Sequence, residues 1–131
     1  MKIIQSILAL SGLILLNSCS TTTKFPISTV TPAAEISAKK KIDKQNNFTL
    51  EITASNLASA ERNSPPGNNY SVWIVSKNNG TKNVGQLNVK NGKKTTFKTV
   101  TPFDFEEIFI TIEDKGDMSY PTGVEISRAK F

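Results

Sequence analysis

The chain has 131 residues, a formal net charge of +5, one cysteine and no histidine. A chain of this length allows one modest domain, and a single cysteine excludes a disulfide within the chain. The absence of histidine excludes Ser-His-Asp and Cys-His catalytic arrangements and the usual histidine-based zinc sites.

The N-terminal stretch has the pattern of a bacterial export signal. Lys2 supplies a positive charge, residues 7–16 an apolar core and Ser18 a small residue directly before Cys19, as in a cleaved signal peptide. The sequence Leu16-Asn17-Ser18-Cys19 resembles the lipobox of bacterial lipoproteins. A transmembrane helix is one alternative, but the apolar run is shorter than the ~20 residues that a span needs. An ordinary cleaved signal with an unrelated cysteine is another.

The lipobox resemblance implies a signal peptide over 1–18, cleavage before Cys19, diacylglycerol on its thiol and usually an acylated N-terminus. Two or three acyl chains anchor stably, because each buried CH₂ contributes ~0.8 kcal/mol. Ser20, not aspartate, follows the cysteine, which resembles the sorting pattern of outer-membrane lipoproteins. In a host with one membrane the anchor would be the plasma membrane.

Residues 19–46 read as a flexible tether. They contain Pro26 and Pro32, many Ser, Thr and Ala residues, and five lysines against two carboxylates. Their apolar residues follow no single period, which predicts a mobile linker. The lysines either attract an anionic membrane surface or are simply solvated.

Alternating apolar residues from Phe48 onward predict a folded domain over 47–131. We expect six strands, at 48–53, 70–75, 84–89, 95–101, 108–113 and 124–131. Turn signals separate several of them, at Asn78-Asn79-Gly80, Asn91-Gly92 and Lys115-Gly116-Asp117. Short strands with such turns predict an all-β fold, an antiparallel Ig-like β-sandwich of six to seven strands. A small open barrel is the alternative.

Three stretches of this domain form an ordered set of motifs. They are Tyr70-Ser71-Val72-Trp73, then Val84-Gly85-Gln86-Leu87, then Ile112-Glu113 with Gly116-Asp117-Met118-Ser119 and Pro121-Thr122-Gly123. Together they resemble the extracytoplasmic C-terminal domain of the anti-sigma-K factor family, which implies a β-sandwich with a role in sensing or protein contact. A lipobox stands in place of the family's cytoplasmic sigma-binding segment and transmembrane helix, and Asp114 in place of its usual proline. Anti-sigma activity is therefore not carried over.

Physical chemistry gives these residues structural roles. Trp73 is expected to be a core anchor, since an indole can bury ~150–250 Å²; an exposed ligand platform is the alternative. Gly116 and Gly123 suit backbone conformations that other residues disfavour, and Pro121 makes the start of the last strand rigid. The predicted structural motif comprises Tyr70, Trp73, Gly85, Glu113, Gly116, Pro121, Thr122 and Gly123.

Charge separates along the domain. Residues 67–103 carry no carboxylate and six lysines, which are Lys77, Lys82, Lys90, Lys93, Lys94 and Lys98, whereas residues 104–117 carry six carboxylates. Either these charges pair across neighbouring strands, or the lysines form a basic hairpin over 77–98 that attracts an acidic partner.

The sequence favours a non-catalytic protein without metal or cofactor. It has no glycine-rich phosphate loop, and the surviving catalytic pattern is a carboxylate pair among Glu106, Glu107, Glu113, Asp114 and Asp117. Nucleic acid is not expected, because no aromatic stacking motif accompanies the lysines. We expect an outer-membrane lipoprotein whose sandwich contacts another envelope protein, through a sheet edge. Binding of an acidic glycan or lipid by the hairpin 77–98 is the alternative.

Overall fold

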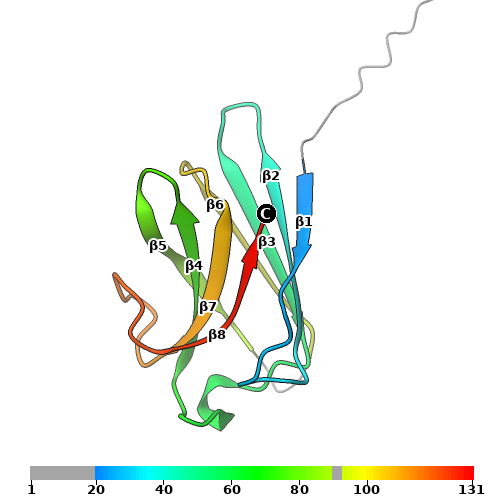
Figure 1. The fold of residues 1–131 in the computed structure, drawn as a ribbon, viewed down its shortest axis with the longest axis vertical. Coiled ribbons are helices and arrows are strands. Elements are labelled where there is room, and N and C mark those ends of the chain that lie inside the picture. The colour runs from blue at the N-terminus through cyan, green and yellow to red at the C-terminus, as the bar shows by residue number, and fades with distance from the viewer. Residues whose placement is uncertain (1–19, 90–92) are drawn as a thin grey trace, which may run out of the picture.

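The computed structural model describes residues 20–89 and 93–131. In these residues, eight strands form two antiparallel sheets that face each other (Figure 1). The first sheet has the order β1 (Ser20–Lys24), β2 (Glu35–Ile42), β3 (Phe48–Ser55) and β6 (Thr95–Thr101). The second has the order β5 (Gly80–Leu87), β4 (Asn69–Ser76), β7 (Glu107–Glu113) and β8 (Val124–Lys130). The predicted all-β sandwich is confirmed.

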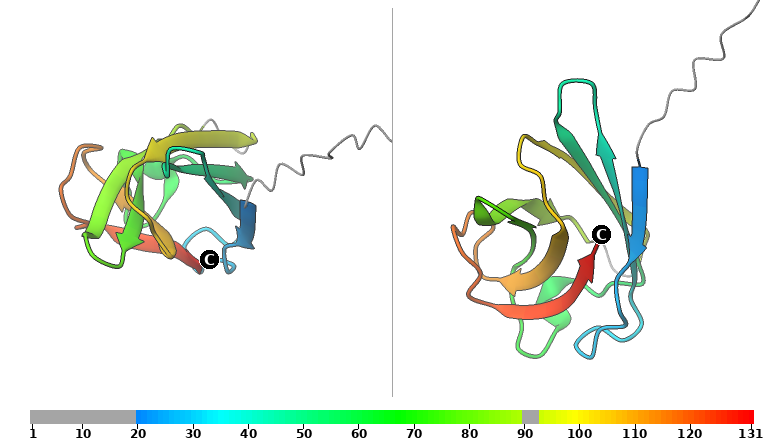
Figure 2. Two further views of the ribbon diagram at one scale, coloured as in Figure 1. Left: turned by 90° about the horizontal axis from the view of Figure 1, so that it is seen from above. Right: turned by 45° about the horizontal axis from the view of Figure 1, so that its top comes forward.

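The strand order is that of an Ig-like sandwich. The chain passes to the second sheet between β3 and β4, returns between β5 and β6, and crosses again between β6 and β7. Without β1, the orders β2-β3-β6 and β5-β4-β7-β8 are the Greek-key arrangement of this fold class. The extra strand β1 is at the edge of the first sheet and lies beside β8 of the second (Figure 2). Within the described residues, the helical element is a short 3₁₀ turn, η1 (Ala60–Arg62), and no helix there is suited to crossing a membrane.

The predicted tether over 19–46 is wrong for the residues that the structure describes. β1 pairs with β2 over its whole length, from Ser20 opposite Lys41 to Lys24 opposite Ser37, and β2 pairs in turn with β3. The domain therefore begins at residue 20 instead of 47 and has two strands more than the six predicted. Cys19 and the predicted signal peptide over 1–18 lie outside the described residues.

The sequence pattern of β2 explains this error. Its inward positions are 36, 38, 40 and 42, and two of these are Ile36 and Ala38, which are buried. The other two are Lys40, whose side chain is only 15% exposed, and Ile42 at the end of the strand. A strand with alanine and lysine at inward positions does not show an apolar alternation in its sequence. It can still pack as a half-buried strand, because the aliphatic part of the lysine covers apolar surface.

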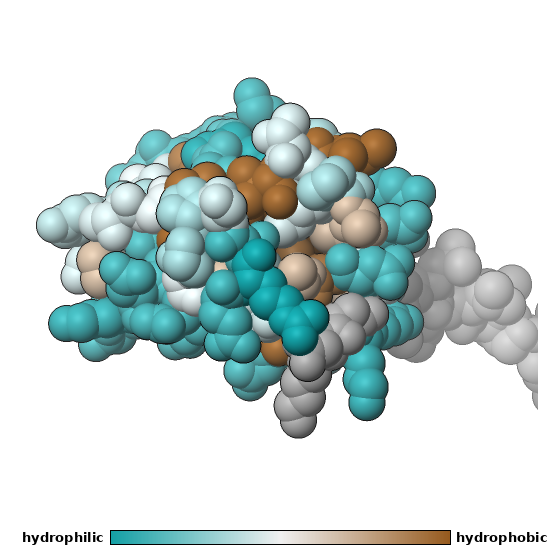
Figure 3. All heavy atoms as spheres, turned by 90° about the horizontal axis from the view of Figure 1, so that it is seen from below, coloured by the Kyte–Doolittle hydropathy of each residue, from teal (hydrophilic) through white to brown (hydrophobic). Residues whose placement is uncertain are grey.

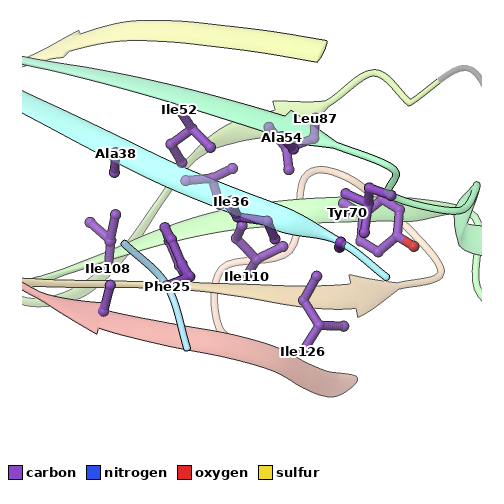
Figure 4. Packing of buried hydrophobic residues seen from close by; sticks show 14 of the residues in the cluster. Phe25, Ile36, Ala38, Ile52, Ala54, Tyr70, Leu87, Ile108, Ile110 and Ile126 are labelled. Atoms are coloured by element: carbon purple, nitrogen blue, oxygen red, sulfur yellow. The ribbon is translucent and has the colours of Figure 1, made fainter. Parts of the chain in front are cut away.

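The core lies between the two sheets. Ile36, Ala38, Ile52 and Ala54 of the first sheet face Tyr70, Ile108, Ile110 and Ile126 of the second, and Phe25 and Leu87 complete the cluster (Figure 4). Ile52, Ile108 and Ile110 have no exposed surface. Since full burial of such a side chain contributes about 1.5–3 kcal/mol, this core stabilises the domain.

The sandwich has two ends, which we name by their relation to β1. The N-terminal end holds the start of β1 and the connections 43–47, 77–79 and 102–106. The distal end holds the connections 25–34, 56–68 and 114–123, together with residues 88–89 and 93–94. Figure 1 shows the N-terminal end at the top and the distal end at the bottom. β2 has eight residues, so the ends are about 26 Å apart at ~3.3 Å per residue.

Candidate interaction surface

The connection 25–34 presents an exposed isoleucine at the distal end. The Phe25 side chain is buried, and its backbone N–H donates to a carbonyl group of β2 at 2.9 Å. The hydroxyl of the buried Ser28 accepts hydrogen bonds, each 3.1 Å long, from two backbone N–H groups that follow it. Between these two fixed points, Ile27 is 80% exposed. The loop therefore holds an apolar side chain in solvent.

A hollow lies beside this isoleucine. It has a volume of about 390 Å³, and Phe25, Pro32 and Ile36 contribute to its lining together with Thr53 of β3. Figure 3 views the distal end directly and shows apolar residues gathered among hydrophilic loops. An exposed aliphatic side chain next to a partly apolar hollow is the kind of surface that proteins use for contact.

Tyr70 fixes a second loop of the distal end, the connection 56–68. Its hydroxyl donates to the carbonyl group of Ala58 at 2.5 Å and accepts from Asn63 Nδ2 at 2.6 Å. Burial raises the pKa of Tyr70, and the hydrogen bond from Asn63 offsets part of that rise. The loop is thus fastened to the core through a neutral phenol.

One buried carboxylate fastens the third loop, the connection 114–123. Glu113, at the end of β7, is 2% exposed. Its Oε1 accepts from the Gly123 N–H at 3.1 Å and from Thr111 Oγ1 at 2.7 Å, and its Oε2 accepts from Thr122 Oγ1 at 2.8 Å. Burial alone raises the pKa of Glu113, but these hydrogen bonds outweigh it, so that pKa lies below its usual value. Glu113 is therefore a charged structural group.

Trp73 belongs to the same network, on the outer face of the second sheet. It is fully buried, and its Nε1–H donates to Thr111 Oγ1 at 2.8 Å. Its ring stacks on Phe109 with the centroids 6.1 Å apart, and the Arg128 guanidinium lies 4.0 Å from the Phe109 centroid. Burial of Trp73 is confirmed and an exposed platform is ruled out. The residue packs outside the inter-sheet core, because its neighbours on β4 occupy the inner face.

Two loop glycines allow the chain to pass close to its neighbours. A Cβ on Gly123 would lie 1.6 Å from the carbonyl oxygen of Ile112, and one on Gly116 would lie 1.5 Å from the Gln86 side chain. Neither glycine has a positive φ, so the expected unusual backbone conformation is wrong and close packing is the reason. The carbonyl group of Gly116 also accepts a hydrogen bond from Asn83 of β5 at 2.9 Å.

The structure unites part of the predicted structural motif. Trp73, Glu113, Thr122 and Gly123 share one hydrogen-bonded network, whose central member, Thr111, sequence reasoning missed. Gly116 and Pro121 lie in the loop that this network fastens. The two other members lie elsewhere, Tyr70 on the inner face of β4 and Gly85 on β5 with φ +141° against the ring of Phe97.

The predicted lysine hairpin does not form, because β5 and β6 belong to different sheets. Lys77 lies at the N-terminal end, 3.8 Å from Glu106, and the Lys82 ammonium lies 4.6 Å above the ring of Phe103. Lys93 and Lys94 are exposed at the distal end, Lys98 is opposite Glu51 in the first sheet, and Lys90 with the Asn91-Gly92 turn lies outside the described residues. The five hairpin lysines that the structure describes are therefore divided between the two sheets and the two ends of the sandwich.

Lys40, assigned to the tether by its sequence, has the least exposed basic side chain among the ion pairs of the described residues. Its Nζ lies 2.6 Å from Asp104 Oδ1 and 4.7 Å from the ring centroid of Phe105, and it donates to the carbonyl group of Phe105. The hydrogen bond from Lys40 lowers the pKa of Asp104. This contact ties β2 to the connection 102–106 at the N-terminal end.

The chain matches no protein-family model, and no curated protein or solved structure is significantly similar to it. The resemblances to the lipobox and to the anti-sigma-K domain consequently rest on the motif residues alone. The exposure of Ile27 and the membership of Thr111 in the network carry no local sequence signal. Both depend on loops that meet strands distant in the chain.

Proposed function

We propose that this protein is an envelope lipoprotein whose β-sandwich is a non-catalytic module that contacts another envelope protein. Lipid on Cys19 would anchor it, in the outer membrane on the pattern set by Ser20, or in the plasma membrane of a host with one membrane. The contact surface would be the distal end, where Ile27 and the hollow beside it lie.

One observation carries this proposal. β1 begins at the residue after the lipobox cysteine and runs away from it, so the exposed Ile27 lies at the opposite end of the sandwich. The distance between the ends is about 26 Å. A module held at one end that presents an exposed isoleucine beside a hollow at the other is suited to contacting a partner away from its own membrane.

The carboxylates favour a structural role over a catalytic one. Three of the five that were considered for catalysis already contact other groups of the protein: Glu113 accepts hydrogen bonds at both oxygens, Glu107 pairs with Arg128 at 3.0 Å, and Glu106 lies 3.8 Å from Lys77. A general acid or nucleophile needs an oxygen free to meet the substrate.

Photo-crosslinking in intact cells tests the contact surface. A photoreactive amino acid replaces Ile27 in one variant and Val100 in a matched control, since Val100 is also an exposed aliphatic residue (60%) but lies on β6 toward the N-terminal end. We expect mass spectrometry to identify one protein that crosslinks at position 27 and not at position 100. Crosslinks at neither position, or to lipid or glycan alone, would contradict the proposal.

Ionic strength and one substitution distinguish an apolar contact from binding through lysines. An apolar contact should survive a rise in ionic strength, whereas binding through lysines should weaken steeply. Ile27→Asp should abolish co-purification of the partner without lowering the melting temperature, because the side chain is in solvent. A partner that is lost in high salt and retained by Ile27→Asp would point to the lysines instead.

A further inference from the structure

The described structure leaves no linker between the lipobox cysteine and the sandwich. Ser20 directly follows Cys19, and it already pairs with Lys41 in the ladder between β1 and β2. One residue spans at most ~3.6 Å. Lipid on the thiol of Cys19 would therefore hold the N-terminal end of the sandwich at the membrane surface.

The turn between β2 and β3 extends further in this direction than β1 does. β2 continues past Lys41 to Ile42, and residues 43–47 then turn back into β3. At ~3.3 Å per residue, the tip of this turn lies about 7–10 Å beyond Ser20. Figure 1 shows the hairpin rising above the start of β1. The tip thus reaches beyond the single residue that would connect β1 to the lipid.

The turn is built as a fixed structure. Asp43 Oδ1 accepts hydrogen bonds from the backbone N–H groups of Gln45 and Asn47, each 2.9 Å long. The Asp43 N–H donates to the carbonyl group of Asn47 at 2.9 Å, and Asn46 takes the left-handed conformation with φ 61°. The carboxylate of Asp43 is used inside the turn, which leaves the flanking lysines to set the chemistry of its surface.

The side chains around this tip suit lipid headgroups. Lys41 and Lys44 are exposed and form no ion pair with any residue that the structure describes. Ile42 is 43% exposed beside them. Ammonium groups pair with lipid phosphates, and the headgroup layer on each side of a bilayer is about 5–8 Å thick. The protruding tip is long enough to enter that layer.

We propose that the turn 43–47, with Lys41 and Lys44, is a membrane contact that packs against phosphate-bearing lipid headgroups. The inference rests on the proposed lipid anchor. The paired strand β1 imposes the contact, because it keeps the anchor and the turn at the same end of a rigid sandwich. The distal end with Ile27 then points away from the bilayer.

Fluorescence quenching in vesicles tests this arrangement. The full chain is expressed in a lipidating bacterial host, purified, checked by intact mass spectrometry for lipid on Cys19, and reconstituted into phosphatidylethanolamine–phosphatidylglycerol vesicles. An environment-sensitive dye is attached at Gln45→Cys, an exposed position of the turn that leaves Lys41 and Lys44 in place, or, as the matched distal control, at Ile27→Cys. Quenching by lipids with nitroxide headgroups should be several-fold stronger at position 45 than at position 27.

Two results would overturn the inference in distinguishable ways. Lipid on Cys19 with equally weak quenching at both positions would refute the membrane contact and leave the anchor standing. A chain without lipid would refute both.

A linker variant tests whether β1 imposes the contact. Ten Ser and Gly residues, beginning with Ser, are inserted between Cys19 and Ser20, which gives a flexible span of about 16–19 Å. Quenching at position 45 should fall by more than half. Unchanged quenching would overturn the claim that the short connection places the turn.

Discussion

The carboxylate of Glu113 and the backbone N–H of Gly123 are 3.1 Å apart, and this contact closes the ten-residue loop between β7 and β8 onto its own base. Thr122 adds a second donor from the same arm of the loop, at 2.8 Å. Thr111 then connects the carboxylate to the indole of Trp73. One charged group therefore joins the loop to the outer face of the second sheet.

Glu113→Gln should destabilise the domain by about 2–3 kcal/mol, because an amide replaces one acceptor oxygen with a donor facing the donors of Thr122 or Thr111. Urea denaturation of residues 20–131 measures the free energy of unfolding. Asp117→Asn is the matched control: this loop carboxylate is exposed, so its loss should change that free energy by less than ~0.5 kcal/mol. Equal effects of the two substitutions would refute the role of Glu113.

The same carboxylate predicts a pH dependence. Because the pKa of Glu113 is lower in the folded state, its contribution to stability is present above its unfolded pKa and is lost as the pH falls through the folded pKa. With an unfolded pKa of ~4.3, the contribution should be constant above about pH 5 and decline below about pH 4. The difference in unfolding free energy between the natural chain and Glu113→Gln should therefore shrink in acid.

Asp104 is the control for this titration. Its pKa is also lowered, by Lys40, so it loses its charge in a similar pH window. The variant Asp104→Asn should still show the acid-dependent decline that Glu113 causes. Parallel pH curves for the natural chain and Glu113→Gln would contradict the assignment.

Trp73→Ala should lower the free energy of unfolding by about 3–5 kcal/mol, since it removes a fully buried ring. Trp73→Phe keeps a ring but loses the hydrogen bond to Thr111, and should cost about 1–2 kcal/mol. Trp73 is the single tryptophan of the chain, so the native emission should be that of a buried indole, with little quenching by acrylamide. Tyr120→Ala, at a 67% exposed site, should leave the melting temperature unchanged.

Gly123→Ala should destabilise the domain by at least ~2 kcal/mol, because the added methyl group meets a β7 carbonyl oxygen and forces the loop off the sheet. Gly80→Ala is the control, because it introduces backbone strain without a steric clash. Gly80 has φ +70° but no atom near its missing Cβ, so alanine there should cost only ~1 kcal/mol. Thermal melts of the two variants compare these effects; a smaller loss for Gly123→Ala would be inconsistent with the close approach.

Hydrogen exchange distinguishes a paired β1 from a flexible tether. The β1 amides that bond to β2 should be protected by at least tenfold relative to an unfolded chain, although less than those of central strands such as β4, because β1 is a short edge strand. Pulse labelling with mass spectrometry resolves a peptide over residues 20–24. Exchange of that peptide at the rate of an unfolded chain would contradict the pairing of β1 and support a flexible tether instead.

The strands from Phe48 onward could be predicted because their inward residues are large and apolar. Five of the six expected strands agree closely with the structure, while β5 begins at Gly80, four residues before the expected start. β1 and β2 could not be predicted in this way. β1 has no large apolar side chain. β2 has Ala38 and Lys40 at inward positions, so its sequence lacks a clear apolar alternation, and it is recognised as a strand only through its pairing with β3.

Local sequence patterns do not predict several features of the candidate sites. The stretch 70–75 has bulk on both faces, so its sequence does not show that Trp73 packs outward under a hydrogen-bonded loop. The lysine hairpin was expected because six lysines flank the turn signal Asn91-Gly92 without any carboxylate, but β5 and β6 belong to different sheets. Burial of Glu113 depends on Thr122 and Gly123, which only the fold of the loop brings to it.

The anchor at Cys19 can be tested most directly by intact mass spectrometry of the protein extracted from the membranes of a lipidating bacterial host. The predicted mass is that of a chain beginning at Cys19, increased by a diacylglyceryl group and usually one further acyl chain, and Cys19→Ser should abolish both the cleavage and the added lipid. A chain of unmodified mass, or one that Cys19→Ser leaves unchanged, would contradict the lipid anchor and, with it, the placement of the sandwich on the membrane.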